Sequence, residues 1–275
     1  MKKLSLTSPD KSRSIPEFIN LADLSVCIST NDYINENIDS LIGRVPVLVS
    51  ADIQTGGRGR EGRKWIPVGE GGIYISYLLN IKNRESVSFL SLAAATAVAE
   101  AVYRTTGMNV QLKWPNDIEL SGLKAGGILI ENKIFKDNIL AIIGIGLNVN
   151  VREQQLKSEI SKTATSLSIF SGRKTNIGEL ILRISEYLLY FKEKIEDKKH
   201  DQILERYLFY LKHKQGNKLK FKSSGKNIKG TFLKVNDKGG LVLKNENGEE
   251  EQTVNFRNLF LYCIFSIFPE SRFGN

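Results

Sequence analysis

The sequence has little cysteine and little histidine. Its two cysteines, Cys27 and Cys263, are too few for a disulfide framework and lack the paired spacing of a zinc site. Its two histidines, His200 and His213, have no partner spacing for a metal site or a catalytic triad. These shortages argue against a disulfide-rich secreted domain, and we expect a reducing, cytoplasmic location.

Long apolar runs are also missing. Residues 1–20 begin with lysines but contain no apolar stretch of about seven residues, so they do not form a secretory signal. The longest apolar run, residues 89–99, is interrupted by Ser91 and Thr96 and falls short of the roughly 20 residues that span a bilayer. We expect a loose lead-in over residues 1–20 and no membrane segment.

Acidic residues are outnumbered by basic ones, which gives the 275-residue chain a net charge of +9. An excess of this size indicates anionic partners: nucleic acid, nucleotide, an acidic protein or a membrane surface. Charge alone does not choose among them. A hydrophobic content of 41% is ordinary for a soluble protein, and the length suits one large domain or a large and a small one.

The most distinctive stretch is residues 54–65, with four glycines and four cations among twelve residues. Glycine lets successive backbone N–H groups wrap around oxygens, and the cations supply charge. Apolar residues 45–49 and 73–79 predict a strand on either side. We interpret the stretch as an anion-binding loop. A flexible surface turn and an RNA-binding Arg-Gly tract are the alternatives, although such tracts lie in low-complexity sequence and this one is a single copy.

Before this loop, residues 24–28 predict a strand and residues 33–42 a short helix. The tetrad Ser29-Thr30-Asn31-Asp32 between them consists of residues that favour helix N-caps. The same short polar side chains could line a pocket, and both interpretations stay open.

After the loop, residues 86–106 predict an alanine-rich helix that ends at Gly107. Residues 110–131 alternate like two strands joined at Ser121-Gly122, with a bulge at residues 115–117. Lys124 lies just beyond the turn, where a solvated lysine is the simplest interpretation. Residues 139–151 predict a strand in which Gly144 and Gly146 allow close approach of a flat ligand or tight packing against a helix.

The last third changes its period. Asn176 and Glu179 form a capping box that begins an amphipathic helix, and the lysine-rich residues 192–214 predict a solvated helix. From Gly216 the period becomes two, and short strands over residues 219–254 predict a small β unit compatible with an SH3-like barrel. We place a domain boundary near Lys214.

In combination, these segments resemble the biotin protein ligases. The resemblance covers residues 24–261 and rests on motifs in the family's order: Ser29-Thr30-Asn31, residues 57–65, Lys113-Trp114-Pro115-Asn116-Asp117, Lys124 with residues 126–129, residues 144–148 and residues 164–167. It implies an α+β fold, a mixed sheet flanked by helices, with an SH3-like β-barrel at the C-terminus. The implied domains are a catalytic domain over residues 21–214 and a C-terminal domain over residues 215–268.

The resemblance implies a ligase that joins biotin to ATP as biotinyl-AMP and passes it to a lysine of a carrier protein, such as the biotin carrier of acetyl-CoA carboxylase. Polar residues and the loop would hold biotin: Ser29, Thr30, Asn31, Gln54, Arg58, Gly59, Arg60 and Lys124. Cations, an aromatic ring and two amides would hold ATP: Arg58, Arg60, Arg63, Trp65, Lys113, Asn116, Lys124 and Asn148.

The same resemblance implies catalytic roles. Arg60, Arg63 and Lys124 would stabilise negative charge at the α-phosphorus, and Asp117 would orient the acceptor lysine or the metal. Mg²⁺ would accompany ATP, with ligands that we leave unassigned. A homodimer is compatible with the family.

Two departures from the family pattern stand out. Gly72 replaces an asparagine, and Arg257-Asn258 replaces a Gly-acidic pair. Because only 28 residues precede Ser29, we expect the monofunctional type, without a DNA-binding domain or a specific DNA partner. A lipoate-type ligase of the same fold and a non-catalytic nucleic-acid-binding protein are the alternatives. Against the nucleic-acid-binding alternative, the sequence contains no aromatic-and-basic stacking motif.

Overall fold

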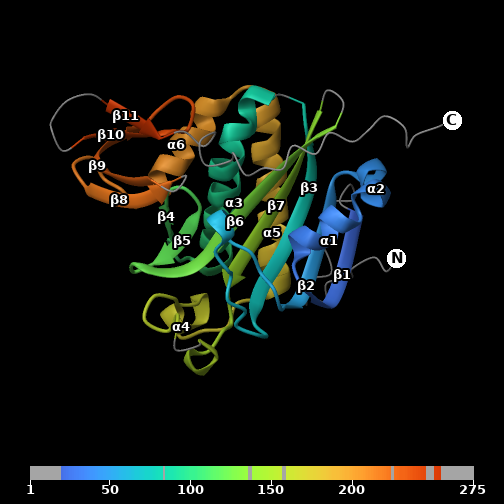
Figure 1. Cartoon of the computed structure of the whole chain (residues 1–275). Coiled ribbons are helices and arrows are strands. Elements are labelled where there is room, and N and C mark those ends of the chain that lie inside the picture. Colours follow the sequence, from blue (N-terminus) through green and yellow to red (C-terminus); the bar gives the residue numbers. More distant parts are fainter. Residues whose placement is uncertain are drawn as a thin grey trace.

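The computed structural model describes residues 20–82, 84–135, 138–156, 159–223, 226–245 and 251–254. Expectations about residues 1–19, Cys263 and Arg257-Asn258 therefore lie outside the described residues. Figure 1 shows a large sheet with helices on both faces and a smaller sheet beside it. The predicted mixed sheet flanked by helices is confirmed.

The large sheet has seven strands. Its edge strand β1 runs parallel to β2, and all other neighbouring pairs are antiparallel, which makes the sheet mixed. In spatial order the strands are β1 (Asn20–Cys27), β2 (Val47–Gln54), β3 (Gly72–Ile81), β7 (Asn138–Asn148), β6 (Leu123–Phe135), β5 (Asp117–Leu120) and β4 (Gln111–Lys113).

Helices divide between the two faces of this sheet (Figure 1). The described α-helices are α1 (Thr30–Glu36), α2 (Ile38–Leu41), α3 (Leu90–Thr106), α4 (Leu167–Ser171), α5 (Ile177–Glu196) and α6 (His200–Tyr210). Four 3₁₀ helices are described as well: η1 (Ile42–Arg44), η2 (Arg60–Gly62), η3 (Arg84–Phe89) and η4 (Glu153–Gln155).

Strand alternation explains why both faces are covered. In β2, Val47 and Val49 pack with Ile34 and other residues of α1 and α2, whereas Leu48 points into the larger cluster beneath α3 and α5. Successive side chains of a strand face opposite sides, so an unbroken apolar run needs cover on both. The helical layers provide that cover.

Helix α3 is the predicted alanine-rich helix, and it begins and ends close to its expected bounds. Its small side chains are buried from Leu90 to Val102, and Gly107 caps it in the left-handed conformation. Residues 87–106 are long and apolar enough to cross a membrane, but 78% of their most apolar window is buried inside the fold. The helix therefore serves as a core helix here.

The predicted two-stranded hairpin is wrong in one respect. The Ser121-Gly122 turn is present, with both residues at positive φ, but the first segment is split into β4 and β5. Lys113 pairs with Asp117, so residues 114–116 form a second turn instead of a bulge. Because proline lacks an N–H donor, the ladder breaks there. This turn carries Asn116 and Asp117 to the sheet's edge.

The solvated helix predicted for residues 192–214 is confirmed only in part: most of the stretch is helical with many exposed side chains, but it is broken, and its histidines are packed. Helix α5 begins at its predicted Asn176 cap but ends at Glu196, and α6 starts at His200, whose ring stacks on Phe89 with centroids 4.2 Å apart. His213 lies beyond α6, 6.1 Å from the ring of Phe232. Both histidines are partly buried and help to pack the fold.

The smaller sheet contains four antiparallel strands: β8 (Lys218–Ser223), β9 (Lys226–Val235), β10 (Leu241–Lys244) and β11 (Glu251–Val254). It contacts the large sheet where Trp114 Nε1 donates to the carbonyl oxygen of Gly239 over 3.4 Å. The predicted barrel and domain limits extend past residue 254 and remain predictions.

Candidate functional site

A pocket that is open to solvent lies where the glycine loop crosses the sheet. Its lining comes from the start of α1, the loop after β2, the β4–β5 turn and the adjoining stretches of β6 and β7: Ser29, Thr30, Asn31, Gln54, Arg58, Gly59, Arg60, Arg63, Lys64, Trp65, Asn116, Asp117, Lys124, Gly127, Ile128, Leu129, Gly144, Ile145 and Gly146.

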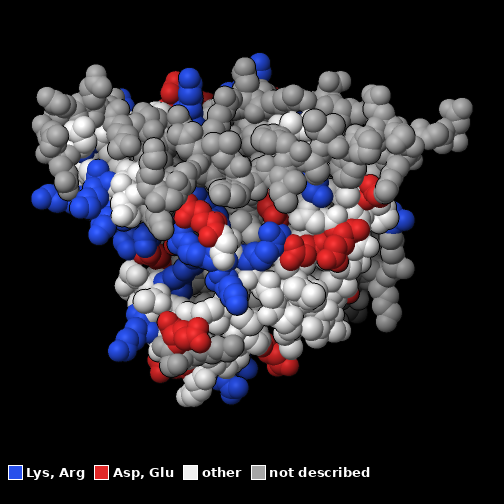
Figure 2. All heavy atoms as spheres, in the orientation of Figure 1, with Lys and Arg blue, Asp and Glu red and all other residues white. Residues whose placement is uncertain are grey.

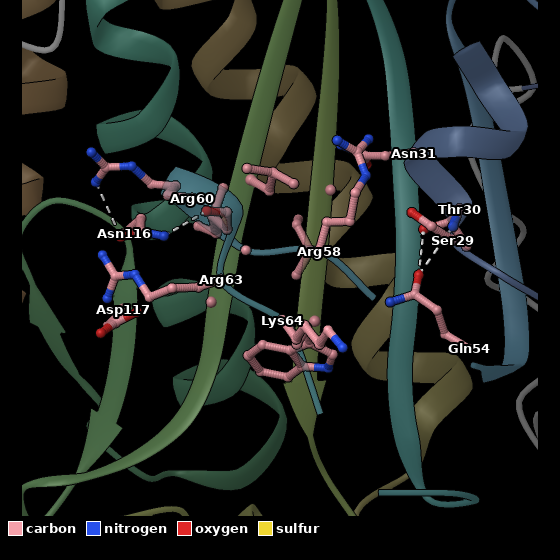
Figure 3. A pocket seen from close by; sticks show the side chains of 18 of the residues that line it. Ser29, Thr30, Asn31, Gln54, Arg58, Arg60, Arg63, Lys64, Asn116 and Asp117 are labelled. Carbon is pink, nitrogen blue, oxygen red and sulfur yellow. Dashed lines mark hydrogen bonds between the residues drawn. The ribbon is translucent and has the colours of Figure 1, made fainter. Parts of the chain in front are cut away.

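One side of the pocket is formed mainly by uncharged polar side chains, with Arg58 and its carboxylate partners next to them (Figure 3). Ser29, Thr30, Asn31 and Gln54 are all buried there. Gln54 Oε1 accepts from the backbone N–H of Thr30 over 3.0 Å, and Ser29 Oγ caps α1 by accepting from the backbone N–H of Asp32 over 3.3 Å. The polar tetrad therefore does both things that its sequence left open: it caps a helix and lines a pocket.

Asn31 is held from three directions. Its Nδ2 donates to Glu131 Oε2 over 2.7 Å, and its Oδ1 lies 2.6 Å from Ser76 Oγ. A Cβ atom on Gly144 would come within 2.3 Å of Asn31 Oδ1, so only glycine leaves room for this side chain. The strand glycine serves α1 packing, one of its two predicted explanations.

The glycine loop is a small hairpin. Arg58 and Lys64 form a β-bridge, Gly59 N donates to Arg63 O over 2.7 Å, and Trp65 N donates to Gly57 O over 2.9 Å. Glu61 and Gly62 form its tip with positive φ values of 55° and 72°. The amides of Gly59, Arg63 and Trp65 are thus engaged within the hairpin itself and do not face a ligand.

Arg58 has two acidic partners. Its Nη2 lies 2.6 Å from Asp32 Oδ1 and 2.9 Å from Glu131 Oε2. Partial burial works against the guanidinium charge, but the two carboxylates outweigh burial and raise the pKa of Arg58. The charge of Arg58 is thus already balanced, and its side chain ties the loop to α1 and β6.

Arg60 differs from Arg58. Its Nη1 donates to Asn116 Oδ1 over 3.3 Å, and within the described part of the chain no carboxylate lies within ion-pair distance. Burial lowers the pKa of Arg60 below its ordinary value. A partly buried cation without a counter-ion is costly, and it marks a place where an anion would be stabilised.

Opposite the polar side, charged groups gather. Figure 3 shows Arg60 and Arg63 beside Asn116 and Asp117, and Figure 2 shows Lys and Arg side chains collected around the hollow in this face. Arg63 is 71% exposed and lies 3.7 Å from Glu61, so it remains available to a ligand. The pocket thus has a neutral polar end and a cationic end.

Lys124 is anchored at both ends. Its backbone N–H donates to Thr163 O and its carbonyl accepts from Thr165 N, which binds residues 163–165 to the start of β6. Its Nζ lies 2.5 Å from Asp117 Oδ1 and 5.5 Å from the centre of the Trp65 ring. Lys124 therefore lines the pocket with a defined position, unlike a solvated turn lysine.

Trp65 lies on the floor of the pocket. A Cβ atom on Gly146 would meet its indole at 2.9 Å, and one on Gly127 would meet it at 3.4 Å. The space over Gly146 that the sequence suggested for a flat ligand holds this indole. Trp65 Nε1 is buried without an acceptor among the described residues.

Two predicted ATP-binding residues do not line the pocket. Lys113 Nζ pairs with Glu119 Oε1 over 3.0 Å, and Asn148 Nδ2 donates to Thr165 O over 3.0 Å. Their assignment to ATP remains a prediction that the pocket lining does not support. All the other predicted site residues meet in the pocket.

Sequence reasoning missed three polar groups that hold the site together: Asp32 as an ion-pair partner, Ser76 and Glu131. Ser76 stands in β3 opposite Gly144 in β7, and Glu131 ends the run that follows Lys124. Polar residues at positions where a buried strand is otherwise apolar were the available signal. Gly72 has a simpler explanation, since a Cβ atom there would meet the ring of Tyr74 at 2.9 Å.

The sequence matches a profile of the biotin/lipoate A/B protein ligase family over residues 24–150. The structure resembles a biotin protein ligase from Aquifex aeolicus solved in complex with biotin and ATP, with a TM-score of 0.74 and 32% identity, covering 86% of this chain and 96% of that one. The chain belongs to the biotin/lipoate A/B protein ligase family.

Two further relatives, both ligases by name, are similar to this chain in sequence. The bifunctional ligase/repressor BirA of Bacillus spizizenii is 34% identical over 207 residues, which are 73% of this chain and 62% of the relative. A biotin–[acetyl-CoA-carboxylase] ligase of Mycobacterium tuberculosis is 35% identical over 126 residues, 44% of each chain. The chain thus spans 62% of the length of the Bacillus relative.

Proposed function

We propose that this protein is an ATP-dependent biotin ligase, which activates biotin as biotinyl-AMP and transfers it to a lysine of a carrier protein. The observation that carries the proposal is the two-ended pocket. Its neutral end offers amide and hydroxyl groups, which suit a ureido ring. Its cationic end holds Arg60, which has no carboxylate within ion-pair distance in the part of the chain that the structure describes. Family membership and the likeness to a ligase solved with biotin and ATP support the same substrates.

The first half-reaction brings a carboxylate up to a triphosphate. The carboxylate oxygen attacks the α-phosphorus, the bond from that phosphorus to the bridging oxygen breaks, and pyrophosphate leaves. Negative charge grows on the α-phosphoryl oxygens, so fixed cations stabilise the transition state more than the ground state. Arg60 and Lys124 supply those cations, and exposed Arg63 supplies a third.

In the second half-reaction the acceptor lysine of the carrier attacks the acyl carbon of the adenylate, and AMP leaves. The lysine ammonium must lose one proton before it attacks, and its nitrogen loses another as the amide forms. Asp117 is the carboxylate that lines the pocket beside Lys124. We assign Asp117 to orienting that amine or the metal. Lys124 lies between the two substrates in this scheme.

Mg²⁺ belongs to the proposal as the partner of ATP. In the described ranges no group of three or more His, Cys, Asp or Glu side chains could hold a metal by itself. Mg²⁺ commonly takes one or two carboxylates and completes its shell with phosphate oxygens and water. Asp117, which keeps one oxygen away from Lys124, fits that limited demand.

The carrier, the C-terminal unit and the assembly are further parts of the proposal. We infer a biotin carrier such as that of acetyl-CoA carboxylase, which the name of the Mycobacterium relative mentions. An SH3-like C-terminal domain, a homodimer and a cytoplasmic location complete it. Specific DNA binding is not part of the proposal.

A lipoate ligase is the competing function within the family. Lipoate carries a dithiolane in place of the ureido ring, so it would leave the buried amide and hydroxyl groups of the neutral end unpaired. An unpaired buried polar group costs about 1–3 kcal/mol, which favours biotin.

The test is to mix the protein with ATP and Mg²⁺, add biotin or lipoate separately, and measure pyrophosphate. We expect pyrophosphate to be released when biotin is added and not when lipoate is added. Biotin should also raise the melting temperature of the protein, and lipoate should not. Equal release with both acids, or release with lipoate alone, would reject the assignment.

A further inference from the structure

Glu131 lies next to the pocket, in contact with two of its lining residues, and receives two hydrogen bonds on one oxygen. Its Oε2 accepts from Asn31 Nδ2 over 2.7 Å and from Arg58 Nη2 over 2.9 Å. Asn31 belongs to α1, Arg58 to the glycine loop and Glu131 to β6, so one carboxylate joins three elements. Figure 3 shows Arg58 and Asn31 approaching each other at this point.

The carboxylate decides which way the amide of Asn31 points. An ionised carboxylate only accepts hydrogen bonds, so it must face the amide nitrogen, and Oδ1 is then turned to Ser76 Oγ, 2.6 Å away. The single proton of Ser76 goes to this oxygen, because an amide oxygen cannot donate. Thr30 Oγ1, 2.7 Å from Ser76 Oγ, continues the chain of hydroxyls.

The order of donors and acceptors in this network is therefore fixed before any ligand arrives. Close packing against Gly144 restrains the Asn31 side chain further, because Asn31 Oδ1 fills the space that a Cβ atom on residue 144 would occupy. A ureido ring presents N–H donors and a carbonyl acceptor at fixed positions. It should therefore bind more tightly to a pocket whose donors and acceptors are fixed than to one in which the Asn31 amide can turn over.

We propose that Glu131 is a positioning residue for biotin, which acts by fixing the amide of Asn31. The inference rests on the proposed function and goes beyond it by assigning biotin selectivity to a residue that does not itself line the pocket. Glu131 also holds Arg58, and this second task must be separated from the first.

Asp32 makes that separation possible. Its Oδ1 lies 2.6 Å from Arg58 Nη2, and among the described residues the amide of Asn31 donates to Glu131 and not to Asp32. Asp32→Asn weakens the hold on Arg58 and leaves Asn31 fixed. Glu131→Gln weakens the same hold and also lets the amide turn, because a carboxamide can either donate or accept.

The experiment measures biotin binding by titration calorimetry for the parent, Glu131→Gln and the matched control Asp32→Asn. We expect Glu131→Gln to weaken biotin binding by about 10-fold, the lower end for a hydrogen bond to a charged group. Asp32→Asn should weaken it by less than about threefold, and ATP binding should stay within about twofold in both. Melting curves without ligand check that each variant folds.

A double-mutant cycle with Asn31→Ala distinguishes positioning from general structural support. If Glu131 acts through Asn31, Glu131→Gln should have little further effect on biotin binding once Asn31 is alanine. Effects of the two changes that simply add would overturn the inference. Should Glu131→Gln fail to fold, Glu131→Asp gives the same test, since its shorter carboxylate withdraws from Asn31.

The outcomes also distinguish this inference from the proposed function. A parent protein that does not bind biotin would reject the function. A parent that binds biotin, with Glu131→Gln binding equally well, would reject the role of Glu131 and leave the function standing.

Discussion

Lys124 meets the acidic Asp117 at 2.5 Å and is fixed by residues 163–165 at its backbone. A lysine held in this way acts as a placed charge. Lys124→Gln should slow adenylate formation by ~10²–10³, the usual effect of removing one electrostatic donor, with the melting temperature little changed. Pyrophosphate release with biotin and ATP measures the rate.

Two comparisons sharpen that prediction. Lys124→Arg should recover little, because a planar guanidinium cannot take the place of a compact ammonium. Lys133→Gln, on the same strand but outside the pocket lining, should behave like the parent. When biotinyl-AMP is supplied, transfer should be much less impaired than formation. A Lys124→Gln enzyme that makes adenylate at the parent rate would remove Lys124 from the mechanism.

Two glycines of the loop make a matched pair. A Cβ atom on Gly57 would lie 2.5 Å from Gln54 Nε2 and 2.9 Å from Trp65 Cβ, whereas one on Gly59 would meet Arg63 O at 3.3 Å. Gly57→Ala must displace Trp65 or Gln54, so we expect it to weaken biotin and ATP binding by about 10-fold, against about threefold for Gly59→Ala. Titration calorimetry measures both.

Neither glycine belongs to the large hydrophobic cluster between the sheet and α3, and Trp65 packs only at the edge of a small one, so both alanine variants should keep the parent's melting temperature within a few degrees. A stronger effect at Gly59 would mean that a ligand approaches the backbone there, as the sequence had suggested. A larger effect at Gly57 means that the glycine serves the packing of Trp65.

Between elements, the small sheet meets the β4–β5 turn at Trp114, whose indole donates to Gly239 O over 3.4 Å. The same turn carries Asn116 and Asp117 into the pocket. Trp114→Phe keeps an apolar ring and removes the donor, which should cost about 1 kcal/mol and lower the melting temperature by about 2–4 °C.

If the small sheet steadies this turn, Trp114→Phe should also raise the KM for ATP by about threefold while biotin binding stays unchanged, because the neutral end of the pocket lies on other elements. Steady-state kinetics with each substrate varied in turn separates the two. A loss of stability with an unchanged KM for ATP would confine the contact to a structural role.

Most of the elements could be predicted from the sequence, because their signals are local. The Asn176 cap, the Gly107 stop and the Ser121-Gly122 turn each depend on a few neighbouring residues, and all three are present. The split between β4 and β5 was missed, since alternation continues across Pro115 and only pairing reveals the turn.

The candidate site was predictable to the extent that its residues stand in compact motifs. Glu131 and Ser76 were missed because their importance arises from neighbours that are 100 and 45 residues away in sequence. The balanced charge of Arg58 and the unbalanced charge of Arg60 were equally invisible, as both look alike in the motif. Contacts that form only on folding decide such cases.

At the scale of the whole molecule, His213 gives the fold an acid-sensitive element. Burial, together with the charges of Lys113 and Lys212, lowers the pKa of His213 from 6.5 to about 4. The unfolded chain therefore binds a proton more readily than the folded one below about pH 6.5. Stability from neutral His213 is present above that value and is lost as the pH falls towards 4.

We expect the free energy of unfolding to fall between pH 6.5 and about 4, and His213→Gln to make that fall shallower. Urea titrations at a series of pH values measure the slope. His200, whose pKa burial also lowers, should keep part of the slope in the variant. Identical slopes in parent and variant would show that His213 does not supply the acid sensitivity.

The isolated charge of Arg60 has a consequence for the ligand-free molecule as a whole. Among the described residues this partly buried guanidinium donates to Asn116 and has no carboxylate within ion-pair distance, which makes it a point of energetic frustration where folding alone would favour a neutral side chain. Arg60→Met should therefore raise the melting temperature of the ligand-free protein by a few degrees and abolish the further rise that ATP produces in the parent. Arg60 therefore lowers the stability of the ligand-free protein slightly, and a bound nucleotide anion would offset that loss by pairing with its charge.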